Sequence, residues 1–181
     1  DYIRFPSDGD MENIKFPFSE GKKKSVALKE FFAFLDATFH PKKIPISADL
    51  FGMTTSNSDD LGIGQILENA LVHFDYVAPM VYPSHYPTNF LGFPSPASKP
   101  YEVIKYAMDR AVIKSNAAST SPNKLRPWLQ DFSIGKVDYT PDMVRAQIQA
   151  TYDSGLNSWM LWNASNNYTK SALENASSTS Y

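Results

Sequence analysis

The chain has 181 residues, 43% of them hydrophobic and 20% charged, with a formal net charge of −2. This composition suits one folded domain with a sizeable core, and it excludes a disordered tail or a collagen-like fibre. The near-neutral charge excludes the basic surface typical of nucleic-acid binding. The absence of cysteine excludes disulfides and thiolate-bound metal. No apolar run approaches the roughly 18 residues that cross a bilayer.

Apolar periodicity predicts short strands that alternate with amphipathic helices. The predicted strands are residues 2–5, 44–51, 76–82, 125–132 and 158–162. The predicted helices are residues 25–39, 63–74, about 104–111 and 140–155. Strands separated by helices pair in parallel through right-handed crossovers, so the predicted fold class is α/β.

Some boundaries carry their own chemical signals. Pro41 ends the first helix, and Thr140, Pro141 and Gly155 supply the cap, first turn and terminator of the last one. Residues 76–82 form a nearly continuous apolar run, which predicts a strand buried on both faces. The Pro-rich residues 83–99 are interpreted as a functional loop.

Polar side chains gather where the predicted strands end. They are Asp1, Arg4, Asp49, Tyr82, His85, Gln130, Asp131, Asn163 and Asn166. Because the carboxyl ends of parallel strands share one crevice, carboxylates at the ends of three strands (Asp1, Asp49 and Asp131) favour a shared site. The alternative is that each aspartate only caps the helix or loop that follows.

Aromatic residues near the same strand ends suit stacking against sugar rings; they are Tyr82, Tyr86, Trp128, Trp159 and Trp162. The alternative is that they pack between sheet and helices, as tryptophan usually does. Alternation along the last strand favours the core for Trp159 and the site for Trp162.

Other chemistries lack support in the sequence. There is no nucleotide-binding glycine loop, no GxSxG elbow and no HExxH motif. His40 and His73 are interpreted as helix-end residues, whereas His85 lies in a strand-end loop and is a candidate ligand contact. We expect neither a cofactor nor a metal.

Five segments together resemble one bacterial family, the domain-of-unknown-function family 4015, which is named a putative glycosyl hydrolase domain. They are DYIRFPSDG, ISADLFG, YVAPMVYPSHY, LRPWLQDF and WMLWNASNNY, in this order. The resemblance covers residues 1–168 and leaves residues 169–181 as a polar tail. It implies a TIM-type (β/α)₈ barrel of which this chain supplies strands four to eight, the remaining strands coming from the parent chain or another subunit.

The resemblance also implies that the strand-end residues face a site, and from their chemistry and spacing we assign the roles that follow. Asp1, Asp49 and Asp131 would be the catalytic candidates, with Asp1 as nucleophile, Asp49 as acid/base, and Asp131 as a substrate contact or alternative catalytic partner. The implied substrate-binding residues are Arg4, Tyr82, His85, Trp128, Gln130, Trp162 and Asn163.

The leading hypothesis is therefore two-carboxylate hydrolysis of an O-glycosidic bond in a poly- or oligosaccharide. The alternative is a non-catalytic carbohydrate-binding or scaffold module derived from a hydrolase. Metal-assisted deacetylation is disfavoured because the expected histidine pair is missing. A glycan-directed activity favours an extracytoplasmic or secreted location.

Overall fold

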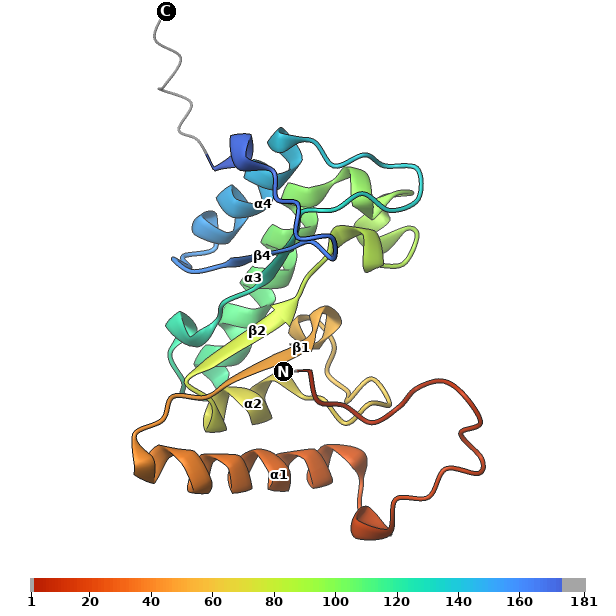
Figure 1. The fold of residues 1–181 in the computed structure, drawn as a ribbon, viewed down its shortest axis with the longest axis vertical. Helices are drawn as coiled ribbons and strands as arrows, with labels where there is room; N and C mark the ends of the chain where they lie inside the picture. Colours follow the sequence, from red (N-terminus) through yellow and green to blue (C-terminus); the bar gives the residue numbers. More distant parts are fainter. Residues whose placement is uncertain (1, 174–181) are drawn as a thin grey trace, which may run out of the picture.

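The computed structural model describes residues 2–173, which contain a four-stranded parallel sheet (Figure 1). Its order β1-β2-β3-β4 follows the sequence, with β1 at Ser47–Phe51, β2 at Tyr76–Met80, β3 at Trp128–Gln130 and β4 at Met160–Trp162. Tyr2 forms one parallel bridge to Asp49, so the N-terminal segment lies along the outer edge of β1. The α/β class is confirmed, and the complete barrel remains a proposal.

Four α-helices connect and cover these strands. They are α1 (Lys24–Phe39), α2 (Leu67–His73), α3 (Pro100–Ala117) and α4 (Pro141–Asp153). All four contribute to one apolar cluster with the sheet, through side chains such as Phe32, Leu71, Met108 and Ala150. Within the described part of the chain, no helix is both long and apolar enough to cross a membrane.

The two faces of the sheet have different environments. Side chains alternate between faces, so Ala48, Leu50, Val77 and Leu129 lie on the helix-covered face, where each is at most 3% exposed. The opposite face carries Asp49, Phe51, Met80, Trp128 and Trp162, of which none is fully buried. The prediction that residues 76–82 are buried on both faces is therefore wrong at Tyr76, which is 36% exposed, and at Met80, which is partly exposed.

The start of α2 also differs from the prediction. The apolar pattern predicts a helix from Ile63, but Gly62 and Gly64 adopt positive φ angles of 67° and 83°, which turn the chain before the helix. Gln65 is fully buried and holds this turn, since its side chain accepts from Phe51 N at 2.8 Å and donates to Ile3 O at 2.8 Å. The helix begins two residues later, at Leu67.

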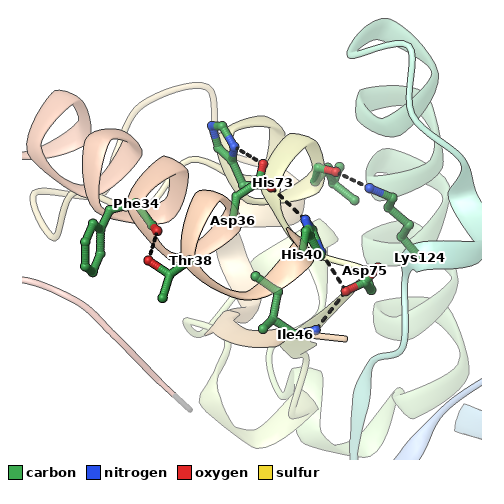
Figure 2. Close-up of polar contacts among 9 residues, drawn as sticks. Phe34, Asp36, Thr38, His40, Ile46, His73, Asp75 and Lys124 are labelled. Atoms are coloured by element: carbon green, nitrogen blue, oxygen red, sulfur yellow. Dashed lines mark hydrogen bonds and ion pairs between the residues drawn. The ribbon is translucent and has the colours of Figure 1, made fainter. Parts of the chain in front are cut away.

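A histidine–aspartate network joins α1 to the amino ends of β1 and β2 (Figure 2). His40 lies between two carboxylates, with Nδ1 2.6 Å from Asp36 Oδ1 and Nε2 2.9 Å from Asp75 Oδ2. The other Asp36 oxygen is 2.9 Å from Nδ1 of His73, and Ile46 N donates to Asp75 at 2.7 Å. Because both ring nitrogens of His40 face acceptors, the network fits the protonated imidazolium.

We expect this network to make stability depend on pH. Hydrogen bonds to Asp75, and to a lesser extent to Asp36, raise the pKa of His40. The stability that His40 contributes is therefore complete below its ordinary pKa of 6.5 and is lost as pH rises through the pKa of the folded state. The bonds from His73 and His40 lower the pKa of Asp36. Those from Ile46 and His40, with the nearby Lys124 charge, lower the pKa of Asp75. Both carboxylates therefore stabilise the fold at pH values above their ordinary pKa of 3.8. This stabilisation is lost as pH falls through their lowered pKa values in the folded protein.

The unfolding temperature should consequently be highest in mildly acidic buffer and fall above neutrality. Thermal unfolding followed by circular dichroism from pH 4 to 9 measures this, and His40→Gln should flatten the fall on the alkaline side. Glu30→Gln is the control, since it breaks the exposed Lys22–Glu30 pair without involving a histidine. An unchanged profile in His40→Gln would refute the assignment.

Candidate active site

The open face of the sheet brings one carboxylate and two indole rings together. Asp49 lies on β1, Trp128 on β3 and Trp162 at the end of β4. The Trp128 indole Nε1 donates to Asp49 Oδ1 at 3.0 Å. The rings of Trp128 and Trp162 meet edge to face, with centroids 5.8 Å apart and planes at 81°. Trp162 is 42% exposed, so this aromatic surface is open to solvent.

A second aromatic group follows β2. Tyr82 meets His85 and Phe132 with ring centroids 5.3 and 5.4 Å away, and His85 belongs to the short 3₁₀ helix η4 (Pro83–His85). Burial raises the pKa of Tyr82 and the neighbouring Asp49 charge raises it further, so the phenol stays protonated. Burial lowers the pKa of His85 from 6.5, which keeps its imidazole neutral at pH 7.

Gln130, a predicted substrate contact, lies at the end of β3 but is fully buried, and its side-chain amide is hydrogen-bonded to other residues of the chain. Its Oε1 accepts from Ser84 N at 3.1 Å and from Ser84 Oγ at 2.9 Å, and its Nε2 donates to Phe132 O at 2.8 Å. These bonds tie the loop after β2 to the loop after β3. The geometry favours a role for Gln130 in holding the aromatic group in place.

Asp131 is similarly occupied, and it is only 3% exposed. Thr169 donates to its carboxylate twice, from N to Oδ2 at 2.8 Å and from Oγ1 to Oδ1 at 2.6 Å. The Asn163 amide donates to Asp131 O and accepts from Ser165 N at 2.8 Å. These contacts fasten residues 163–169 over the end of β3, and they favour an anchoring role for Asp131 over a catalytic one.

The two predicted site residues of the N-terminal segment are placed differently. Arg4 Nη1 donates to Phe5 O at 3.1 Å and to Ser7 Oγ at 3.0 Å, and within residues 2–173 it pairs with no carboxylate. Asp1, the predicted nucleophile, lies outside the described residues. The bridge from Tyr2 to Asp49 fixes the segment that follows it beside β1.

Sequence reasoning omitted several residues that shape this site. Ser84 and Thr169 act through hydrogen bonds to Gln130 and Asp131, 46 and 38 residues away in the chain. Phe132 and Tyr168 lie close to Tyr82. For Ser84, Phe132 and Tyr168 a signal was present, because each lies in one of the strand-end segments; Thr169 follows the last of these segments and carries no such signal.

The resulting site is an open aromatic surface around Asp49, suited to a ring-shaped polar ligand. Carboxylates bind hydroxyl groups and exchange protons, and aromatic rings stack on the apolar faces of sugars. Among residues 2–173, no three histidine, aspartate or glutamate side chains converge to hold a metal ion. A hollow of about 470 Å³ lies elsewhere, between the N-terminal segment and the start of α1, and includes Phe5 and Phe16.

Residues 1–168 match the family described as "Putative glycosyl hydrolase domain". The match covers nearly the whole chain, so the chain belongs to this family, and the resemblance predicted from its strand-end segments is confirmed. No curated protein matches the chain.

Among solved structures, the chain is similar to the glycoside hydrolase domain of PgaB (BpsB) from Bordetella bronchiseptica. The TM-score is 0.54 at 18% sequence identity, and the match covers 81% of this chain and 39% of that one. At this identity the likeness concerns the fold alone. The matched region amounts to well under half of the length of that structure.

Proposed function

We propose that this chain forms the carboxyl-terminal part of a (β/α)₈-barrel glycoside hydrolase that cleaves O-glycosidic bonds of a poly- or oligosaccharide. Family membership supports a hydrolase, and the parallel sheet with helices on one face supports the barrel. The observation that carries the proposal is the Asp49 carboxylate on the open face of the sheet, close to Tyr82 and bonded to Trp128, whose ring meets that of Trp162.

In this mechanism Asp49 is the acid/base residue and Asp1 the nucleophile. A general acid protonates the leaving oxygen while the second carboxylate attacks the anomeric carbon, after which the acid, now a base, activates water. Asp1 is retained as the nucleophile from the strand-end pattern of the sequence, because neighbouring strands are about 4.8 Å apart and the carboxylates of retaining enzymes are separated by roughly 5–5.5 Å. Asp131 is the alternative partner, but its bonds to Thr169 argue against it.

Trp162, Tyr82 and His85 would contact the sugar in this proposal, with Trp128 beside them bonded to Asp49, while Gln130, Asn163 and Arg4 would act through the loops that they hold. The uncovered edge beside Tyr2 would receive the remaining strands of the barrel from the parent chain or another subunit. A glycan substrate supports an extracytoplasmic or secreted location.

A second candidate is a carbohydrate-binding module that has lost catalysis. It is favoured by one specific observation: Asp131 is buried and bonded, so Asp49 is the single carboxylate among the three predicted ones that the described residues leave open to a ligand. A binding module needs the aromatic surface but no second carboxylate.

One experiment separates the two. The protein, produced at the full length of its natural gene, is incubated with a panel of poly- and oligosaccharides, and both binding and the release of new reducing ends are measured. We expect binding with release for at least one glycan. Binding without release from any bound glycan would overturn the hydrolase and leave the binding module.

A further inference from the structure

The bond between Trp128 and Asp49 crosses the strand that separates them. Asp49 is on β1 and Trp128 on β3, 79 residues apart in the chain, and β2 lies between. Asp49 pairs with Ala78 of β2, whereas Trp128 pairs with Met80, two residues further along that strand. The indole must therefore extend back across β2 to bring its N–H to the carboxylate.

Ala78 makes this crossing possible. It lies on the open face of the sheet, outside the helix-packed cluster, and yet it is 0% exposed. A methyl group is short enough to lie beneath the two side chains and their hydrogen bond, which together cross two strand spacings, about 9–10 Å. A larger residue at this position would occupy the path of the ring.

The edge-to-face contact with Trp162 restrains the indole from the other side. Trp128 is consequently held between β4 and Asp49, and its bond occupies one oxygen of the carboxylate, Oδ1. Within residues 2–173 no hydrogen bond to Oδ2 is present, so that oxygen is available to a ligand. A bond to an ionised group is stronger than one between neutral groups, which suits it to fix an orientation.

We propose that Trp128 is a positioning residue that fixes the Asp49 carboxylate with Oδ2 toward the substrate, and that this is its main role rather than stacking on a sugar. The assignment rests on the proposed function of Asp49. It makes Trp128 act through its indole N–H, a feature that phenylalanine lacks and that a stacking surface does not require.

The first test is Trp128→Phe in the full-length protein, which keeps an aromatic face and removes the N–H. We expect kcat on a hydrolysed glycan to fall about 10- to 100-fold with KM nearly unchanged. Trp159→Phe is the matched control: it removes an indole N–H that donates to the Tyr152 hydroxyl at 3.0 Å, from a ring packed against the helix-covered core, and should leave kcat unchanged. A Trp128→Phe variant with wild-type kcat, or one that changes only KM, would overturn the proposal.

The second test does not depend on turnover. In ¹⁵N-labelled protein the Trp128 indole N–H signal, assigned by its loss in Trp128→Phe, should shift and exchange faster with solvent in Asp49→Ala, but not in Asp138→Ala on the exposed loop after β3. An unmoved signal in Asp49→Ala overturns the proposal. A moved signal in a protein that hydrolyses no glycan would contradict the proposed function while upholding the Trp128–Asp49 bond.

Discussion

Replacing Asp49 by asparagine should lower kcat on a hydrolysed glycan by about 10²- to 10⁴-fold, the range expected when a general acid or base is removed. Asparagine matches aspartate in shape and still offers Oδ1 to the Trp128 indole, so the aromatic surface and glycan binding should persist. What is lost is the exchangeable proton of the carboxyl group. Initial rates of reducing-end release and calorimetric binding of the same glycan give the two numbers.

The matched control is Asp138→Asn, which makes the same substitution at an exposed position of the loop after β3. It should hydrolyse the glycan at the wild-type rate. If Asp49→Asn retained more than half of the wild-type kcat, Asp49 would not be the acid/base residue, and Asp131 would have to be reconsidered despite its bonds to Thr169.

Residues 1–181 produced alone should associate. The outer surface of α1 exposes Val26, Phe31 and Phe34 by 45%, 39% and 62%, and the two phenylalanine rings stack on each other with centroids 6.3 Å apart. Beyond Tyr2 the edge of the sheet is open in the described residues. Covering about 400 Å² of apolar surface lowers the free energy of the protein by roughly 10 kcal/mol, which is comparable to the folding stability of a whole domain. We therefore expect further polypeptide on this side.

Light scattering coupled to size-exclusion chromatography measures this association. Phe34→Glu should reduce it, whereas Ile113→Glu, which replaces an apolar residue 57% exposed on α3, should not. A monodisperse monomer of residues 1–181 that unfolds cooperatively would show that the open edge needs no cover.

The alternation of elements could be predicted from the sequence because its signals are local. Thr140 caps α4 as predicted, its side chain accepting from Met143 N, and Gly155 follows with a φ of 78°. The strand predicted at residues 125–132 is shorter in the structure, because it begins only after Pro127, which has no N–H to donate to a neighbouring strand. By contrast, the start of α2 depends on the side chain of Gln65, which bonds to residues 14 and 62 positions away.

The candidate site could be located but not resolved into roles. Parallel strands bring their carboxyl ends to one edge, so the placing of Tyr82 and Trp162 there followed from topology. The bond between Trp128, at the start of β3, and Asp49 did not, because it crosses the face of the sheet. The role of each polar residue depends on hydrogen-bond partners that are distant in the sequence. In the sequence Asp131 and Asp49 look alike at their strand ends. In the structure Thr169 bonds to both carboxylate oxygens of Asp131, whereas the Trp128 indole bonds to only one oxygen of Asp49.

The most direct test of glycoside hydrolysis follows the oxygen of water. The full-length protein is incubated with a bound oligosaccharide in H₂¹⁸O, and the products are analysed at once by mass spectrometry. Hydrolysis places one ¹⁸O on the new reducing end, so the wild type should yield labelled fragments and Asp49→Asn almost none. A glycan that binds the wild type and remains intact, with no labelled fragment, would contradict the account.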